Sequence, residues 1–292
     1  HTLVTPGLFL CLSVAMTHFF AGDGEKIHVQ ISGAGSPILM LHGWTASHRE
    51  WQPFLEQLTA HHRVFRWDAR GHGGHRLAQD TAPTVQRMAQ DMCNLIEHYR
   101  LDEWVVVGHS MGALTLWQYI EEHGCRNLRK VVFIDQSPKL LTDDTWSDGI
   151  YGKFDREQSE AFLRQLEDDF AESVLRLGGM GLNERARQKY HENAHGLEKA
   201  RQWLSAQDPA PLIACWESLA EADYRNALER IDIPALLVYG GDSNYYRSET
   251  AHYVKNRIAG AILHIYEGSD HSPHQWQRDR FVRDLREFID SP

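Results

Sequence analysis

A serine between two glycines stands in the segment 108–112, which reads Gly-His-Ser-Met-Gly. An apolar, β-branched run at 104–107 precedes it, and a helical pattern begins near residue 112. A strand that turns sharply into a helix strains the backbone of the middle residue, and small neighbours let the two elements approach. The turn would lift the hydroxyl of Ser110 above the carboxyl edge of a sheet, at the positive end of the helix. The pattern predicts a nucleophilic serine, with a glycine-rich packing turn as the alternative.

Partners for this serine are present later in the chain. A serine hydroxyl is a poor nucleophile at neutral pH, so it needs a base within hydrogen-bonding reach and an acid that orients the base. His271 and His274 follow the last apolar run and are candidate bases. Asp135 and Asp242 each follow an earlier apolar run, and both are candidates for the acid.

Short apolar runs alternate with segments of helical spacing over the first half of the chain. Such runs are typical of strands that are covered on both faces, and the alternation predicts a parallel sheet with right-handed crossovers. An opening hairpin and two late strands complete an α/β fold with a mostly parallel central sheet flanked by helices. The predicted strands are 18–21, 26–32, 37–41, 64–67, 104–107, 131–134, 235–239 and 262–266, and the predicted helices are 50–59, 84–99, 112–122, 250–258 and 278–289.

The alternation stops for about ninety residues after the strand at 131–134, and only helical patterns fill this interval. Asp155 and Gln158 form a capping-box pattern, and apolar residues from Phe162 to Leu177 fall on one helical face. We interpret the interval as a lid. Further helices are predicted at 183–207 and 211–222, and the predicted division is an extension at 1–15, a core at 16–136 and 228–292, and an inserted helical cap at 137–227.

Composition narrows the classes of partner. The 292 residues include 30 Lys and Arg against 40 Asp and Glu, and the net charge of -10 would repel a nucleic acid backbone. The 18 histidines are scattered without a supporting carboxylate or cysteine pattern, so no metal site is predicted. The cysteines are too far apart for a zinc site or a disulfide framework, which favours a reducing, cytoplasmic location; they are Cys11, Cys93, Cys125 and Cys215.

The apolar run at 7–15 bears on location as well. It is too short for a membrane-crossing helix of ~20 residues, so no transmembrane segment is predicted. Residues 13–15 loosely resemble a signal-peptide cleavage site, but no basic residue precedes the run. We expect residues 1–15 to be an extension of a cytoplasmic protein, with export as the alternative if they are a signal-peptide remnant.

These residues and motifs resemble the α/β-hydrolase superfamily over nearly the whole chain, from about residue 16. The turn around Ser110, the inserted cap and the order serine, aspartate, histidine match the family pattern. The segment 42–44 (His-Gly-Trp) resembles the family's oxyanion turn, and the segment 70–73 (Arg-Gly-His-Gly) resembles its structural loop. The downstream Trp51 makes the branch of ester and C–C-bond hydrolases the most similar one.

The resemblance assigns roles to the candidate residues. It implies that His271 is the base and that His274 lies in the pocket wall or bonds to residues behind the base. It favours Asp242 as the acid, 29 residues before His271, which leaves room for one helix and one strand. Asp135 occupies the position that some lipases use and is the alternative acid, whereas Asp270 is expected to be a solvated turn residue.

The resemblance also implies where an oxyanion would be bound. The backbone N–H groups of Trp44 and Met111 would donate to the oxygen as negative charge develops on it. His42 would be a structural hydrogen-bonding residue or part of the pocket. Aromatic residues gather in the predicted cap, where most would pack its core and a few would line an apolar pocket. The candidate pocket residues are His42, His274, Trp146, Tyr151, Trp216 and Tyr245.

The predicted function is a serine hydrolase that cleaves a small or medium, mainly apolar carboxylic ester through an acyl-enzyme. A C–C-bond hydrolase acting on a vinylogous diketone, or a lactonase, would use the same residues. A non-hydrolytic member, such as a cofactor-independent oxygenase or a ligand receptor, is a further alternative. No motif indicates a cofactor. The expected partner is a small ester-like molecule, and a homo-oligomer is possible.

The negative charge is concentrated in one part of the chain. Residues 143–172 hold ten acidic and three basic residues, an excess of 10 − 3 = 7. The predicted cap surface is therefore acidic, and we expect it to disfavour strongly anionic substrates in a manner that salt weakens.

Overall fold

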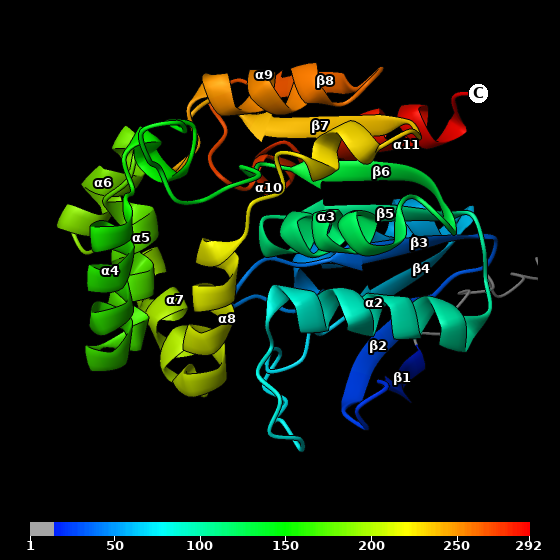
Figure 1. Cartoon of the computed structure of the whole chain (residues 1–292), viewed down its shortest axis with the longest axis horizontal. Coiled ribbons are helices and arrows are strands. Elements are labelled where there is room, and N and C mark those ends of the chain that lie inside the picture. Colours follow the sequence, from blue (N-terminus) through cyan, green and yellow to red (C-terminus); the bar gives the residue numbers. More distant parts are fainter. Residues whose placement is uncertain (1–14) are drawn as a thin grey trace, which may run out of the picture.

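A computed structural model describes residues 15–292 as a twisted sheet with helices on both faces (Figure 1). The predicted extension lies outside the described residues except for Ala15, which begins the first strand. The strands are β1 (Ala15–Phe20), β2 (Lys26–Ser32), β3 (Ser36–Leu41), β4 (His62–Trp67), β5 (Trp104–His109), β6 (Leu128–Ile134), β7 (Ala235–Gly240) and β8 (Ile262–Tyr266). Every predicted strand is present.

The order of the strands in the sheet is β1-β2-β4-β3-β5-β6-β7-β8. β1 and β2 form the expected antiparallel hairpin, and β2 also runs antiparallel to β4. All the other neighbouring pairs are parallel. The carboxyl ends of β3, β5, β6, β7 and β8 therefore lie at one edge of the sheet, and residues that follow these strands are brought together there.

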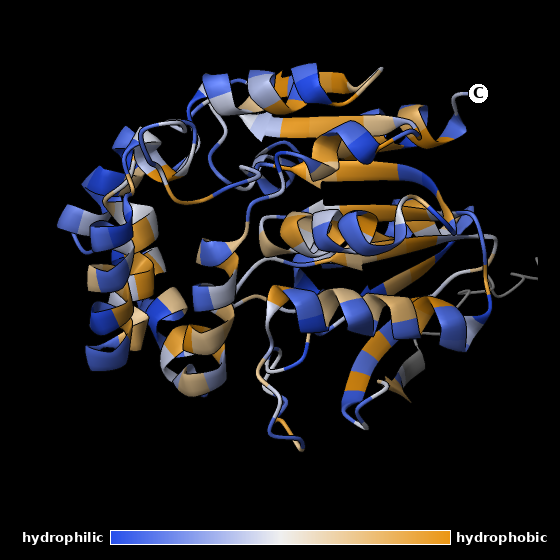
Figure 2. Cartoon of the chain, in the orientation of Figure 1, coloured by the Kyte–Doolittle hydropathy of each residue, from blue (hydrophilic) through white to orange (hydrophobic). Residues whose placement is uncertain are grey.

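The central strands are buried on both faces, as their continuous apolar runs predict. All six residues of β5 are buried, and β3, β6 and β7 each have all but one residue buried. Figure 2 shows these strands as hydrophobic bands between helices of mixed hydropathy. Alternate residues serve opposite faces, since Val106 packs in one core cluster while Val105 and Val107 pack in the other.

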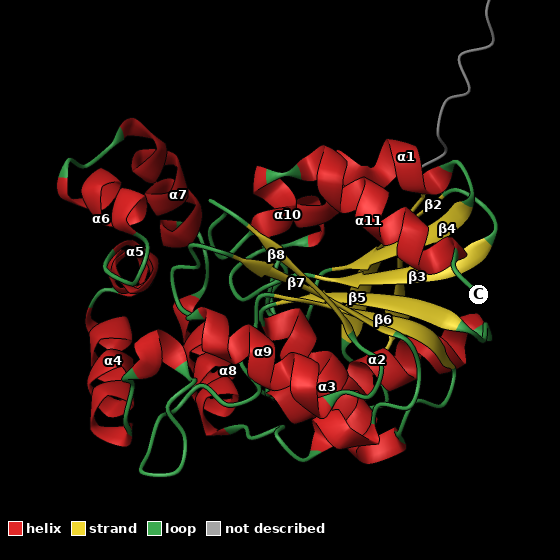
Figure 3. Cartoon of the chain, turned by 90° about the horizontal axis from the view of Figure 1, so that it is seen from above, coloured by secondary structure: helices red, strands yellow, loops and turns green. Residues whose placement is uncertain are grey.

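Two groups of helices cover the sheet (Figure 3). Helices α2 (Val85–Tyr99), α3 (Met111–His123) and α9 (Ser248–Arg257) cover one face, and α1 (Leu55–Thr59) and α11 (Arg278–Asp290) cover the other. The helix predicted at 50–59 is only partly correct, because a 3-10 helix, η1 (His48–Phe54), occupies its first part. Pro53 lies inside η1, and proline disfavours helical backbone in the preceding residue and supplies no N–H.

A further group of helices, separate from the two that cover the faces, lies beyond the carboxyl edge of the sheet (Figure 1). Its first helix begins at the predicted capping box, with Asp155 and Gln158 bonding to each other's backbone. The long helices of this group are α4 (Arg156–Asp168), α5 (Phe170–Gly179), α6 (Glu184–His191), α7 (His195–Ser205) and α8 (Pro209–Glu221), and shorter helices elsewhere are η2 (Ile150–Gly152), η3 (Ala227–Arg230) and α10 (Pro273–Trp276). None of the helices in the described range has the length and apolar character needed to cross a membrane.

The single helix predicted from Phe162 to Leu177 is in fact two helices. Asp169 adopts an extended conformation with φ -148° and ψ 92° and separates α4 from α5. Its side chain accepts a hydrogen bond from the backbone N–H of Glu172, which caps the start of α5. The apolar spacing continues across this break, because α4 and α5 each bury an apolar face in the same core cluster.

Candidate active site

The predicted nucleophile stands on a strained turn between β5 and α3. Ser110 has φ 56° and ψ -118°, a conformation that is rare for a residue with a side chain. The flanking glycines are required by close packing. A Cβ added to Gly108 would lie 2.6 Å from a backbone atom of Gly112, and a Cβ added to Gly112 would overlap the carbonyl oxygen of Leu41. The strand-turn-helix arrangement therefore takes the form that the sequence predicts.

The predicted base lies within reach of this serine. Nε2 of His271 is 3.0 Å from Oγ of Ser110. The backbone N–H of His271 donates to Oδ1 of Asn244 at 3.0 Å, which fixes the loop that carries the base. A histidine in this position can remove the hydroxyl proton as the serine oxygen attacks.

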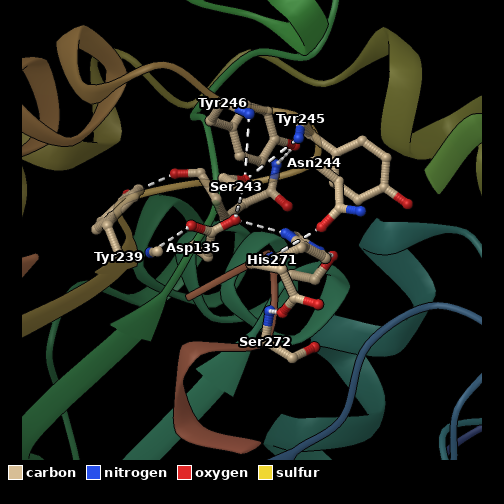
Figure 4. Close-up of polar contacts among 12 residues, drawn as sticks. Asp135, Tyr239, Ser243, Asn244, Tyr245, Tyr246, His271 and Ser272 are labelled. Atoms are coloured by element: carbon tan, nitrogen blue, oxygen red, sulfur yellow. Dashed lines mark hydrogen bonds and ion pairs between the residues drawn. The ribbon is translucent and has the colours of Figure 1, made fainter. Parts of the chain in front are cut away.

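The acid next to the base is Asp135, and the prediction of Asp242 is wrong on this geometry. Nδ1 of His271 lies 2.5 Å from Oδ2 of Asp135, whose side chain is fully buried at the end of β6. Asp242 is exposed, and its carboxylate makes no hydrogen bond within the described part of the chain. Figure 4 shows the carboxylate of Asp135 pointing to the imidazole of His271.

Neighbouring groups explain why Asp135 takes this place. Its Oδ1 accepts a hydrogen bond from the backbone N–H of Gly240 at 2.9 Å, and its Oδ2 accepts one from the hydroxyl of Ser243 at 2.8 Å. The Ser243 hydroxyl also accepts from the backbone N–H groups of Tyr245 and Tyr246, each at 3.2 Å (Figure 4). The loop after β7 thus presents a serine to the carboxylate of the neighbouring strand and turns its own aspartate outward.

The predicted oxyanion donors border the same cavity as Ser110. Trp44 and Met111 both line it, and neither backbone N–H donates a hydrogen bond to any other described residue. The turn before Trp44 lies close to the nucleophile, since a Cβ added to Gly43 would be 3.4 Å from the Cβ of Ser110. These two amides are available to a bound carbonyl oxygen.

The turn that carries Trp44 is also bonded to the helices beyond the sheet edge. The indole N–H of Trp44 donates to the carbonyl oxygen of Leu212 in α8 at 2.9 Å. The indole N–H of Trp203 in α7 donates to the carbonyl oxygen of Thr45 at 2.9 Å. Two indoles therefore fix the oxyanion turn against α7 and α8.

A cavity of about 250 Å³ opens above the serine. Of the predicted pocket residues, Trp216 and Tyr245 line it, and the ring of Tyr245 packs edge-on against His271 at a centroid distance of 4.5 Å. Burial raises the pKa of the Tyr245 phenol well above its usual range, so it is neutral at ordinary pH. Eight further lining residues have large apolar side chains: Trp44, Met111, Leu114, Leu140, Ile150, Val174, Leu177 and Leu219.

The other predicted pocket residues lie outside this lining. His42 is buried and bonds to the backbone of Gly43 and Ala69, as expected of a structural histidine. Trp146 donates to the carbonyl oxygen of Lys139 at 2.9 Å. Tyr151 packs against Tyr245 and bonds to the backbone of Leu177, one layer behind the cavity wall.

His274 is likewise absent from the cavity wall. It is fully buried behind the base, where its Nε2 lies 3.1 Å from Oε2 of Glu50. The alternative expectation for His274, a bond behind the base, is therefore the correct one. Glu50, His109 and Gln136 also border the cavity, and sequence reasoning missed all three. The position of His109 immediately before the nucleophile was the available signal for one of them.

One group of side chains has the composition of a metal site. Glu50, His109 and His274 place one ligand atom each within 4.8 Å of one another. Each of these atoms is already engaged in a hydrogen bond within the group, because Oε2 of Glu50 lies 3.1 Å from both histidines. A metal ion would have to displace the proton between Glu50 and His109, so a hydrogen-bonded group accounts for the arrangement better than a metal site does.

The chain belongs to the alpha/beta hydrolase fold family, because the model of that family matches residues 36–277. Membership agrees with the sheet order, the turn at Ser110 and the resemblance found in the sequence. Fold, turn and family together identify an enzyme of the hydrolase class.

Two curated relatives match nearly the whole chain. This chain is 28% identical over 276 residues to the non-heme chloroperoxidase CPO-A1 of Kitasatospora aureofaciens, and the match covers 91% of this chain and 97% of the relative. This chain is also 27% identical over 262 residues to the pimeloyl-[acyl-carrier protein] methyl ester esterase of Vibrio vulnificus, and the match covers 90% of this chain and 97% of the relative.

Solved structures show the same fold. An esterase from Exiguobacterium antarcticum superposes with a TM-score of 0.81 at 23% identity, covering 95% of this chain and all of the other. The enol-lactonase of Burkholderia xenovorans superposes with a TM-score of 0.74 at 21% identity, covering 94% of this chain and all of the other.

Proposed function

We propose that this protein is a serine hydrolase that cleaves small or medium, mainly apolar carboxylic esters. The observation that carries the proposal is the chain of hydrogen bonds from Ser110 through His271 to Asp135, with distances of 3.0 and 2.5 Å. A serine, a histidine and a buried carboxylate in this order activate the serine oxygen as a nucleophile. The esterases among the relatives support the same reaction.

In the first half of the reaction, Oγ of Ser110 attacks the ester carbonyl carbon while Nε2 of His271 takes the hydroxyl proton. Asp135 holds the Nδ1–H side of the ring and stabilises the imidazolium. The carbonyl oxygen becomes an oxyanion that accepts hydrogen bonds from the amides of Trp44 and Met111. His271 then gives its proton to the departing alkoxide, which leaves as an alcohol.

In the second half, a water molecule attacks the acyl group on Ser110. His271 takes a proton from this water, and the second oxyanion occupies the same amide donors. Collapse of the intermediate returns the proton to Oγ of Ser110 and releases a carboxylic acid. The balance is one ester and one water consumed, one alcohol and one acid formed.

The cavity sets the substrate class. Its volume of about 250 Å³ and its lining of leucine, valine and tryptophan side chains favour a short or medium apolar acyl chain or an aryl group. Gln136 and Tyr245 add neutral polar side chains to this lining.

We also propose that the helices between 137 and 227 form a cap inserted in the core, and that the enzyme works in the cytoplasm. The group of helices beyond the sheet edge supports the first statement (Figure 1). The free thiols of Cys93, Cys125 and Cys215 support the second, because unpaired cysteines suit a reducing compartment.

The test combines turnover with covalent labelling. Wild-type protein should hydrolyse p-nitrophenyl butyrate, and a fluorophosphonate should add its phosphonyl group once, at Ser110, as mass spectrometry of the peptides would show. Ser110→Ala should lose both. Absence of turnover and of labelling in the wild type would refute the proposed function.

A further inference from the structure

A largely buried carboxylate borders the cavity, and the proposed chemistry does not use it. Glu50 lies in η1, and its side chain is about 10% exposed, where it borders the cavity. Its Oε1 accepts a hydrogen bond from the backbone N–H of Gly43 at 3.1 Å. Its Oε2 faces Nδ1 of His109 and Nε2 of His274, each at 3.1 Å. One carboxylate therefore receives three donors from three different segments.

Each of these segments carries a group of the proposed reaction. Gly43 belongs to the oxyanion turn, His109 immediately precedes the nucleophile, and His274 lies in α10, three residues after the base. The backbone carbonyl of Glu50 accepts a further hydrogen bond from the side chain of Gln275 at 2.7 Å, which is a second link to α10, the helix that directly follows the loop of the base. These segments are far apart in the sequence, and Glu50 connects all three.

His109 extends the connection to the base itself. Its Nε2 lies 2.8 Å from the backbone carbonyl oxygen of His271, and its Nδ1 lies 3.1 Å from the Glu50 carboxylate. A carbonyl oxygen and an ionised carboxylate only accept, so both ring nitrogens of His109 donate and the ring is an imidazolium. Burial opposes both charges, but their attraction outweighs it, which raises the pKa of His109 and lowers the pKa of Glu50.

His274 completes the protonation pattern of the group. Its Nε2 donates to Glu50, while its Nδ1 is buried without a partner among the described residues. Burial lowers the pKa of His274 to about 4, so the ring is neutral and contributes a single donor. The group therefore holds one negative and one positive charge, and the charge of Glu50 stabilises the imidazolium in which both ring nitrogens of His109 donate at once.

We propose that Glu50, acting through His109, is a positioning residue that holds the nucleophile and the base in register for attack. The inference deepens the proposed ester hydrolysis and rests on it. A displacement of about 1 Å between reacting groups can cost about a hundredfold in rate, and Glu50 fixes the segments whose relative shift would produce such a displacement.

The test compares Glu50→Gln with Glu56→Gln, a control that removes the same charge from an exposed position in α1. In the first variant, the new side-chain amide carries no charge and offers one acceptor oxygen to three donors, so its N–H₂ group faces a donor in either orientation. With p-nitrophenyl butyrate, kcat should fall about 10- to 100-fold for Glu50→Gln while KM changes less than about twofold. Labelling of Ser110 by a fluorophosphonate should slow by a similar factor, and the control should match the wild type in both measurements.

A second variant covers the case in which Glu50→Gln fails to fold. His109→Asn keeps a donor near the Nδ1 position but has no group that reaches the carbonyl of His271. It should lower kcat to a similar extent, and the double variant should be no slower than the slower single variant, since both act through one connection.

Three results would overturn the inference. They are wild-type kcat and labelling in folded Glu50→Gln, wild-type kcat in His109→Asn, and loss of wild-type activity to a chelator with recovery on addition of zinc. Failure of the proposed function is distinguishable from these results, because it would appear in the wild type as absence of labelling and turnover.

Discussion

At the residue scale, the charge state of a few buried groups follows from their contacts. His72 is buried, its Nδ1 donates to the carbonyl oxygen of Arg70 at 3.1 Å, and its Nε2 has no partner among the described residues. Burial lowers the pKa of His72 to about 3. The folded protein therefore keeps this ring neutral at a pH where the unfolded chain would protonate it.

This difference predicts a loss of stability in acid. A histidine with an unfolded pKa of about 6.5 and a lower folded pKa adds stability above pH 6.5 that is lost as the pH falls toward the folded value. Between pH 7 and about pH 4.5, His72 should account for a decrease of about 2 kcal/mol in the free energy of unfolding. In urea unfolding over this pH range, the free energy of unfolding of His72→Gln should decrease by that amount less than the free energy of unfolding of the wild type. His61→Gln, at an exposed position, should behave as the wild type. Equal pH dependence in all three proteins would refute this account of His72.

The residues of the site were predictable to different degrees. Ser110 and His271 stand in local patterns that only this chemistry explains well, and the structure brings them together. The acid has no such pattern, because β6 and β7 are neighbours and both end at the same edge of the sheet. The spacing to His271 suits either aspartate. The choice depends on which way the loop after β7 turns, and Ser243 settles that by bonding to Asp135.

At the element scale, the sharp turn from β5 to α3 depends on how closely α3 approaches β3. Gly112 lies in the first turn of α3, directly against the carbonyl group of Leu41 in β3. No side chain fits there unless the helix moves away from the sheet. Since Ser110 stands at the start of the same helix, such a movement would also displace the nucleophile.

We therefore expect opposite effects from two glycine-to-alanine substitutions in helices. Gly112→Ala should destabilise the protein by about 3 kcal/mol or more, because packed backbone must move. Gly196→Ala in α7, where an added Cβ meets nothing within 4 Å, should be neutral or stabilise by up to about 1 kcal/mol. Thermal unfolding of the purified variants measures both. An unchanged melting temperature for Gly112→Ala would contradict the close approach of α3 and β3.

Elements of the core were easier to predict than those beyond the sheet edge. Continuous β-branched runs such as those of β5 and β6 have few alternatives to a buried strand, and their bounds are correct within three residues. The helices α4 and α5 share one apolar spacing, so the break at Asp169 is invisible to periodicity. It arises from the cap that Asp169 gives to α5, and a single aspartate in a polar segment is a weak signal.

At the scale of the whole molecule, negative charge gathers on the exposed surface of α4 and the start of α5. Glu157, Glu160, Glu167, Asp168 and Asp169 are all exposed there. The helices of this group border the cavity through Val174 and Leu177 of α5 and Trp216 of α8. We therefore expect an approaching anion to meet a field of its own sign.

The field predicts a salt-dependent preference for neutral esters. At low salt, kcat/KM for p-nitrophenyl butyrate should exceed that for the anionic mono-p-nitrophenyl glutarate by about tenfold, and the ratio should shrink as salt is added. Replacing Glu157 and Glu160 by Gln should reduce the ratio at low salt. Equal kcat/KM for the two esters at low salt would rule out this role of the acidic surface.

The central claim is that Ser110, His271 and Asp135 act as one catalytic group. The most direct measurement is kcat/KM for p-nitrophenyl butyrate in Asp135→Asn and Asp242→Asn, with folding checked by circular dichroism. Asp135→Asn should lower kcat/KM by about 10³- to 10⁴-fold, because His271 loses the partner that fixes its tautomer, and Asp242→Asn should stay within about twofold of the wild type. Full activity in Asp135→Asn together with an inactive Asp242→Asn would contradict it.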